Sequence, residues 1–130
     1  IGHTDRCKAA VIGAPAVDLI SMFGTSDISH AWGPYHWGDH PWDNRDWYIE
    51  RSPITHLHKA TTPSLILVSE GDDRCPVGQA EQVFTTLKNV GVEAELVRYP
   101  GGSHAMPWAG HPVYMADYYD RVSAWFEQRL

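Results

Sequence analysis

The alternation of strand-like and helix-like segments constrains the fold of this chain more than any other feature of its sequence. Residues 8–14 and 64–69 are short apolar runs, typical of strands buried on both faces of a sheet. Residues 92–98 alternate between apolar and polar side chains, which predicts a third strand nearer a sheet edge. Longer segments separate the three runs, and such segments join parallel strands by right-handed crossovers. The sequence therefore predicts an α/β fold with parallel strands and flanking helices.

Helices are expected between and after these strands. Residues 16–23 predict a short helix ending near Gly24, and residues 46–51 predict a helical turn. Pro76 predicts the start of a helix, because proline's missing N–H costs nothing in a first turn. Gly91 suits a left-handed cap at the end of that helix. A last helix is expected over residues 112–128. The apolar face of the helix after Pro76 has spacings of three and four, and comprises Val77, Ala80, Val83, Phe84, Leu87 and Val90.

The segment from Thr25 to Trp47 follows neither a helical nor a strand period. It is rich in aromatic residues and histidines and is interrupted by glycine and proline, with tryptophans at Trp32, Trp37, Trp42 and Trp47. We interpret it as a long connection, of a length usually kept for functional loops. Two interpretations remain open. The tryptophans line a binding pocket with flat aromatic surface, or they form a satellite hydrophobic cluster.

Composition excludes several classes of function. The length of 130 residues suits one domain, and the 43% of hydrophobic residues is enough to build a core rather than a disordered chain. A nucleic-acid partner needs a basic surface, whereas this chain has a net charge of −6 and no run of Lys or Arg. A membrane-spanning helix needs about 18 consecutive apolar residues, and no such run occurs. We therefore expect no nucleic-acid or membrane partner.

The two cysteines and the first residues indicate the cellular compartment of the protein. Cys7 and Cys75 lie far apart and lack CxxC spacing, so we interpret them as small apolar residues rather than a disulfide or metal pair. A reducing, cytoplasmic setting is compatible with this. The first six residues lack the charged head and apolar stretch of a signal peptide. Because the chain begins at Ile1 rather than Met, we expect it to be part of a longer protein.

Two candidate catalytic residues follow consecutive strands. Asp72 comes after the second strand and His104 after the third, and reactive groups of parallel sheets gather at the carboxyl ends of strands. A carboxylate that hydrogen-bonds an imidazole fixes its tautomer and stabilises its protonated form. The order Asp then His is that of the last two triad members in α/β-hydrolases. Taken singly, Asp72 could instead be a turn or helix-capping residue, and His104 a surface histidine.

Several motifs resemble the prolyl oligopeptidase family of serine peptidases. The specific ones are the Asp-x-Arg-x-Pro pattern within residues 70–76 and the Tyr-Pro and Ser-His pairs within residues 97–104. Residues 23–28, 50–53 and 110–112 are similar to the acylaminoacyl-peptidase branch, and the resemblance covers essentially the whole chain. It implies that the chain is the C-terminal portion of an α/β-hydrolase fold. The implied activity is serine-type hydrolysis of short or N-acylated peptides.

The resemblance also implies roles for four residues. Asp72 matches the triad acid and His104 the general base. Arg74 matches an arginine that binds a backbone carbonyl of the bound peptide, a role suited to its planar donor fork. Cys75 stands where the family usually has Val, in the wall of the pocket for the residue before the scissile bond. Alternatively, Arg74 forms a salt bridge to Asp73 or Glu70, and Cys75 is plain core.

The chain also departs from the family. Residues 68–69 are Val and Ser where relatives often have His and Gly, and Trp108 makes the loop after His104 bulkier. The nucleophile of this fold sits on a Gly-x-Ser-x-Gly elbow, and no such motif occurs. The nearest segment, residues 101–105, ends in Ala, and Ser103 adjacent to its own base would be strained. We therefore expect residues 1–130 to be a partial catalytic domain, inactive alone, with the elbow and a β-propeller upstream.

Other functions remain open. The chain could be a non-catalytic remnant, or an interaction module that forms a homo-oligomer or pairs through an open sheet edge. It could also belong to an esterase, although an arginine that holds a peptide carbonyl has less use on a simple ester. Eight histidines invite a metal site, and His56 with His58, or His30, His36 and His40, could supply zinc ligands. No HExxH or Cys/His cluster at ligand spacing occurs, so we expect neither a metal nor a cofactor.

Overall fold

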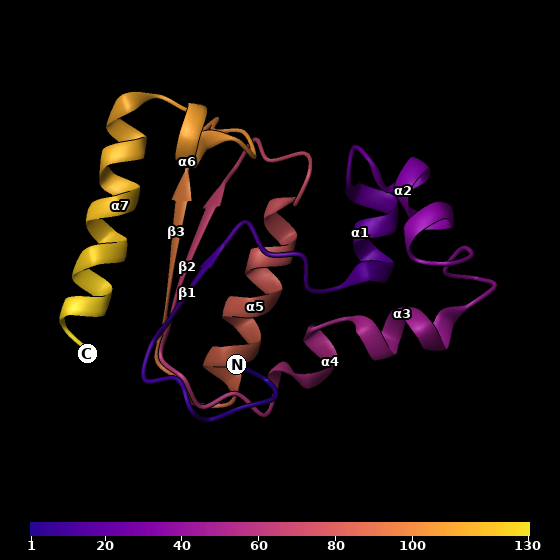
Figure 1. The fold of residues 1–130 in the computed structure, drawn as a ribbon, viewed down its shortest axis with the longest axis horizontal. Helices are drawn as coiled ribbons and strands as arrows, with labels where there is room; N and C mark the ends of the chain where they lie inside the picture. The colour runs from indigo at the N-terminus through magenta and orange to yellow at the C-terminus, as the bar shows by residue number, and fades with distance from the viewer.

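A computed structural model describes the backbone of residues 1–130 and the side chains of residues 1–31 and 35–130. Its sheet has three parallel strands in the order β1 (Ala10–Gly13), β2 (Ser64–Ser69) and β3 (Ala94–Tyr99). Because the strands are parallel and in register, all of them end at the same edge of the sheet (Figure 1). The predicted parallel α/β sheet is confirmed, and each strand lies within two residues of its expected position.

Seven helices occur in the described backbone. They are α1 (Leu19–Thr25), α2 (Ser29–His36), α3 (Arg45–Arg51), α4 (Ile54–Leu57), α5 (Val77–Asn89), α6 (Met106–Ala109) and α7 (Pro112–Glu127). Figure 1 shows α7 on one face of the sheet and α5 on the other, with α1 to α4 beyond α5. The expected helices after Pro76 and at the C-terminal end are confirmed. Gly91 has a φ of +79°, the left-handed conformation expected of a residue that ends a helix.

Two hydrophobic clusters hold the helices to the sheet. Alternate residues of a strand point to opposite faces, and β2 uses both. Ile66 and Val68 pack with Val83 and other residues of α5, while Leu65 and Leu67 pack with Trp125 of α7 and its neighbours. All six residues of β2 are buried. The central strand is therefore fixed from both sides, and the loop that follows it starts from a rigid position.

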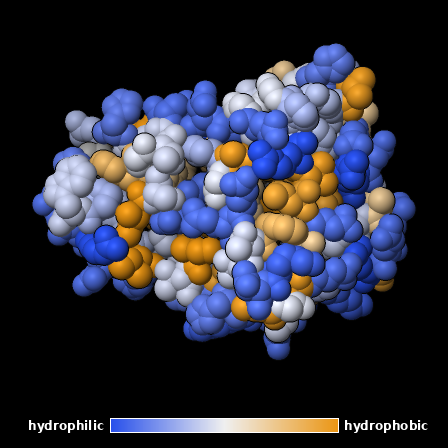
Figure 2. All heavy atoms as spheres, turned by 180° about the vertical axis from the view of Figure 1, so that it is seen from behind, coloured by the Kyte–Doolittle hydropathy of each residue, from blue (hydrophilic) through white to orange (hydrophobic). Residues whose placement is uncertain are grey.

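The strand β1 is less covered than its sequence predicts. Its first three residues are apolar but only half-buried, whereas β2 is buried throughout. The reason is its place in the sheet, because β1 pairs only with β2 and leaves its other edge without a strand among residues 1–130. Figure 2, seen from behind, shows hydrophobic atoms exposed on the half of the molecule that holds the sheet and α7.

The prediction of a continuous non-helical connection over residues 25–47 was wrong. Helix α2 lies inside this segment and α3 begins in it. Helix α2 has no apolar stripe from which it could be predicted. A buried hydroxyl anchors it instead: Ser29 is fully buried, and its Oγ donates a hydrogen bond to the carbonyl oxygen of Met22 at 2.6 Å. Tertiary contacts with α1 thus override a weak local pattern.

The aromatic residues of this segment form a cluster of their own. Tyr48 is fully buried, and its ring makes edge contacts with those of Phe23, Trp37 and Trp47. Trp42 stacks on His40 with 4.5 Å between ring centroids. The described side chains therefore favour the satellite-cluster interpretation. The side chain of Trp32 lies outside the described part of the chain.

Candidate active site

Asp72 lies in the turn between β2 and α5, and its side chain is almost completely buried. The residue is 3% exposed. One carboxylate oxygen, Oδ1, accepts hydrogen bonds from the backbone N–H groups of Arg74 at 3.0 Å and Cys75 at 2.8 Å. These bonds fix the turn and leave the second oxygen, Oδ2, free to contact another group. The turn interpretation of Asp72 therefore holds, whereas the capping interpretation was wrong, because α5 begins after Pro76 and no side chain caps it. The turn accounts for only one of the two carboxylate oxygens.

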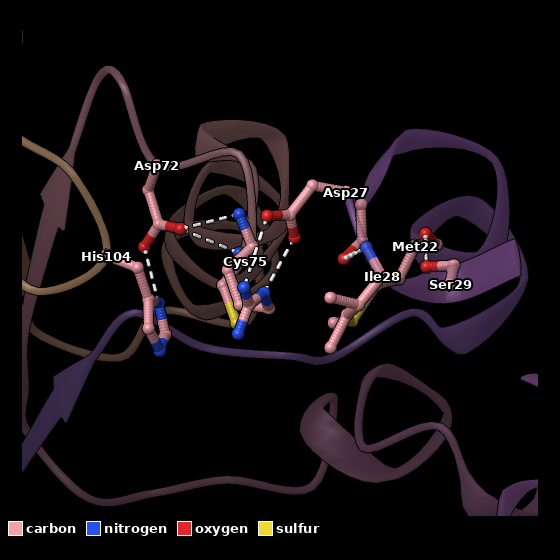
Figure 3. Close-up of polar contacts among 9 residues, drawn as sticks. Met22, Asp27, Ile28, Ser29, Asp72, Cys75 and His104 are labelled. Carbon is pink, nitrogen blue, oxygen red and sulfur yellow. Dashed lines mark hydrogen bonds and ion pairs between the residues drawn. The ribbon is translucent and has the colours of Figure 1, made fainter. Parts of the chain in front are cut away.

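The second carboxylate oxygen of Asp72 contacts the imidazole of His104. Its Nδ1 lies 3.0 Å from Oδ2 of Asp72. Because an ionised carboxylate only accepts hydrogen bonds, this contact places the proton of a neutral imidazole on Nδ1. The second ring nitrogen, Nε2, points away from Asp72 (Figure 3). The side chain of His104 is 37% exposed and that of Asp72 only 1%, so the imidazole faces solvent while its partner does not.

Close backbone packing brings the two loops together. The backbone N–H of Glu70 donates to the carbonyl oxygen of Tyr99, and that of Gly71 donates to Gly102. A Cβ atom at Gly102 would lie 2.8 Å from Oγ of Ser69, closer than such atoms approach in proteins. A larger residue here would force the side chains of Ser69 and Met106 to shift, so the close approach of the His104 loop to the end of β2 favours glycine.

Arg74 is paired with a residue that the sequence analysis did not single out. Its Nε donates to Oδ1 of Asp27 at 2.6 Å and its Nη2 to Oδ2 at 3.2 Å. The hydrogen bond with Arg74 lowers the pKa of the Asp27 carboxyl below its usual value. The salt bridge considered for Arg74, to Asp73 or Glu70, was therefore assigned to the wrong partner. Glu70 instead accepts a hydrogen bond from Arg98 at 3.0 Å.

Cys75 is buried in the same turn. It is 7% exposed, and burial, with a smaller contribution from the charge of Asp72, raises the pKa of its thiol to about 11. Its backbone N–H is held by Asp72. At neutral pH the side chain is therefore a small uncharged group rather than a thiolate nucleophile.

Two hollows flank His104, each of about 370 Å³. Trp108 contributes to both: its ring meets that of His104 edge-on at 6.0 Å between centroids, and it is 63% exposed. The first hollow is the more polar one, lined by Asp27, Gly71, Asp73, Arg74, Ser103, His104, Ala105 and Trp108. The second reaches the end of β1 and is lined by Gly13, Ala14, His104, Pro107, Trp108, Tyr118 and Tyr119.

The histidines considered as zinc ligands do not gather. Among the side chains described, residues 1–31 and 35–130, no group of three His, Cys, Asp or Glu residues is placed to hold a metal ion. His56 lies against the ring of His3 and near the carbonyl oxygen of Glu50. In the same part of the chain, no helix is long and apolar enough to cross a membrane.

A parallel sheet with an acid after one strand and a histidine after the next is an α/β-hydrolase arrangement. Comparison with known proteins gives the family. The model of the prolyl oligopeptidase family, peptidase S9, matches residues 1–130, and the chain belongs to this family.

Individual relatives agree with this assignment. The chain is 38% identical over 130 residues to the uncharacterized peptidase YuxL of Bacillus subtilis, covering 100% of this chain and 20% of that protein. It is 28% identical over 131 residues to the acylamino-acid-releasing enzyme of Arabidopsis thaliana, covering 95% of this chain and 17% of the plant enzyme. The chain thus spans about a fifth of the length of the curated relatives that it matches.

Solved structures show the same fold. The acylaminoacyl peptidase of Pyrococcus horikoshii superposes with a TM-score of 0.93 at 26% identity, covering 99% of this chain and 21% of that one. A puromycin-hydrolyzing peptidase of Mycobacterium tuberculosis superposes with a TM-score of 0.85 at 26% identity, covering 100% of this chain and 19% of the other.

Proposed function

We propose that the protein containing this chain is a serine-type peptidase that hydrolyses short or N-acylated peptides. Asp72 is the triad acid and His104 the general base. Arg74 binds a backbone carbonyl of the peptide, and Cys75 belongs to the wall for the residue before the scissile bond. Family membership supports the reaction type, and the names of the relatives, acylamino-acid-releasing enzymes and acylaminoacyl peptidases, support the substrate class.

One observation carries the assignment of the acid and the base. A buried carboxylate holds Nδ1 of a half-exposed imidazole at 3.0 Å, and Nε2 points away from it. This is the geometry in which a histidine takes a proton from a serine hydroxyl and later passes it to the leaving amine. Because the other oxygen of Asp72 accepts from two backbone N–H groups, the carboxylate is held in place to orient the imidazole.

The nucleophile comes from outside these 130 residues, since no Gly-x-Ser-x-Gly elbow occurs in them. Two features support this. The strand β1 has an edge without a partner strand in the described chain, where further strands of a catalytic domain can pair. The hollow between the end of β1 and His104 leaves space for a serine beside the imidazole. Residues 1–130 alone therefore form a partial catalytic domain without peptidase activity.

A paired assay tests this proposal. The full-length protein and residues 1–130 alone are given a fluorogenic N-acetyl-aminoacyl amide. We expect turnover only with the full-length protein, abolished by His104→Ala and by a serine-directed fluorophosphonate. Turnover by residues 1–130 that Asp72→Ala removes would place the nucleophile inside the chain and overturn the proposal. A full-length protein that hydrolyses simple esters but no amide would instead be an esterase. Inactivity on both substrates would leave an interaction module.

The proposal extends to the cellular compartment and the partners of the protein. Cys7 is an exposed thiol and Cys75 a buried one, and neither is in a disulfide, which supports a reducing, cytoplasmic compartment. The partner required by the proposed activity is a peptide. The free edge of β1 also allows pairing with a second copy, which sedimentation of the full-length protein at several concentrations would reveal.

A further inference from the structure

The contact between Asp27 and Arg74 joins two segments that are 47 residues apart in sequence. Asp27 lies in the loop between α1 and α2, and Arg74 lies in the turn after β2. Beyond the two side-chain hydrogen bonds, the backbone N–H of Asp27 donates to the carbonyl oxygen of Asp73 at 2.9 Å. Three hydrogen bonds thus tie the loop of Asp27 to the turn that also carries Asp72. Figure 3 shows the two that the carboxylate of Asp27 accepts.

This pair is too exposed to matter much for folding. The side chains of Arg74 and Asp27 are 41% and 44% exposed. Ion pairs with this degree of exposure contribute little to stability, because water screens them and two long side chains lose freedom. The geometry of the pair instead fixes the orientation of the Arg74 guanidinium. Two carboxylate oxygens grip one edge of the planar guanidinium, which fixes the plane in which its remaining N–H groups lie.

The remaining donors are available at the hollow beside His104. A guanidinium has five N–H donors, and Asp27 takes one from Nε and one from Nη2. Both N–H groups of Nη1 and one of Nη2 are left. Asp27 and Arg74 line the same hollow as His104. A peptide carbonyl that enters this hollow therefore meets a guanidinium whose orientation is already set.

We propose that Asp27 is a positioning residue that orients Arg74 for the peptide carbonyl, and this inference rests on the proposed peptidase function. Without Asp27, Arg74 is a long side chain with many rotamers beside the carboxylate of Asp73. Each binding event would then have to restrict it anew, and that cost weakens binding. The effect belongs to binding of the peptide and not to the chemical step, because the carbonyl that Arg74 contacts is not the one being cleaved.

The test uses the full-length protein and two substrates. One is an N-acyl dipeptide amide, which offers a carbonyl to Arg74, and the other is a small p-nitrophenyl ester, which does not. We expect Asp27→Asn to raise KM for the peptide roughly tenfold, the size of a weakened hydrogen bond to a charged group, with kcat nearly unchanged. KM for the ester should stay the same. The matched control is Glu81→Gln, because Glu81 also pairs with an arginine, Arg98, but lies outside this hollow.

A double-mutant cycle shows whether Asp27 acts through Arg74. Arg74→Ala should raise the peptide KM at least as much as Asp27→Asn does. In the Arg74→Ala background, Asp27→Asn should then have no further effect. Additive losses would mean that Asp27 contacts the peptide itself or supports another part of the site, and would overturn the inference. Asp27→Ala, which removes the carboxylate altogether, should behave like Asp27→Asn and provides a second variant for every arm.

The inference and the proposed function fail in different ways. A wild-type protein that hydrolyses neither substrate contradicts the proposed function. A wild-type protein active on both, in which Asp27→Asn leaves the peptide KM unchanged, contradicts only the positioning role. A lower peptide KM in Asp27→Asn would mean that Asp27 withholds Arg74 from the substrate, which also overturns the inference. Melting temperatures of Asp27→Asn and Glu81→Gln within a few degrees of wild type would exclude a loss of fold as the cause.

Discussion

Asp72 holds the imidazole of His104 through one carboxylate oxygen, Oδ2, which lies 3.0 Å from Nδ1, while the other oxygen holds the backbone of its own turn. The same side chain thus shapes the turn and orients the histidine. Because the carboxylate is buried, it cannot exchange these contacts for water. The position of the imidazole is therefore tied to the geometry of the β2–α5 turn.

Two substitutions at Asp72 should separate these tasks. In Asp72→Asn the amide oxygen can still accept from the turn, but the amide nitrogen donates to Nδ1 and forces the wrong tautomer of His104. We expect kcat of the full-length protein to fall about 10⁴-fold, as in serine-protease triads, with little loss of stability. Asp72→Ala should lose activity and also about 1 kcal/mol of stability, because two backbone N–H groups of the turn lose their acceptor. Kinetics and thermal unfolding measure both, with Asp120→Asn on the exposed surface of α7 as control. Equal instability of both variants would contradict this division.

Trp108 should influence which side chains the site accepts. It lines both hollows beside His104 and is 63% exposed, so a substrate can reach its ring. We expect Trp108→Ala to lower kcat/KM for substrates with a large apolar side chain about tenfold relative to substrates with alanine. The comparison uses the ratio of the two kcat/KM values, because an effect of the substitution on His104 itself would lower both values equally. Trp42→Ala is the matched control, because Trp42 is 70% exposed but lines neither hollow. An unchanged ratio in Trp108→Ala would rule out this role.

Much of the fold could be predicted because its signals are local. The apolar run of β2 requires burial on both faces, and the structure buries all six of its residues. Pro76 and Gly91 mark the limits of α5 within a residue or two. Asp72 and His104 could be paired from sequence because consecutive parallel strands end at one edge of the sheet, which brings the loops after them together.

The parts that could not be predicted depend on contacts between distant residues. Asp27 lies in a segment without periodicity, and nothing in its neighbours indicates that Arg74 would contact it rather than Asp73. Helix α2 was missed for the same reason, because the buried hydroxyl of Ser29 and not an apolar stripe anchors it. The half-exposed state of β1 follows from its edge position, which an apolar run alone does not reveal.

The two cysteines should differ in reactivity. Burial raises the pKa of the Cys75 thiol to about 11, so at pH 8 almost none of it is the reactive thiolate, whereas Cys7 is exposed. Brief treatment of the native protein with iodoacetamide at pH 8, followed by peptide mapping, should label Cys7 and leave Cys75 unmodified. Addition of urea should make both react. Labelling of Cys75 in the native protein at the rate of Cys7 would show that its turn opens readily.

The free energy of unfolding should be sensitive to substitution of Leu67 in β2 and insensitive to substitution of Leu130. Leu67 is 1% exposed and packs in the cluster under α7, whereas Leu130 is 76% exposed. We expect Leu67→Ala to lower the free energy of unfolding by about 2–5 kcal/mol, because it removes buried methyl groups and leaves a cavity. The same change at Leu130 should cost less than about 0.5 kcal/mol. Urea unfolding followed by circular dichroism compares the two, and similar costs would argue against the packing of α7 on the sheet.

The ion pair of Asp27 and Arg74 should persist over the whole range in which a peptidase assay is practical. Its hydrogen bond with Arg74 lowers the pKa of Asp27, so the folded protein releases this proton more readily than the unfolded chain does. The contact is therefore complete at neutral pH and is lost only as the pH falls through that lowered pKa. Carbon-13 NMR of the Asp27 carboxyl should give a midpoint below about 3.9, the ordinary aspartate value. Arg74→Ala should move the midpoint upward, because the hydrogen bond that lowers the pKa of Asp27 is then removed. A midpoint that does not respond to Arg74→Ala would mean that the two side chains are not paired in solution.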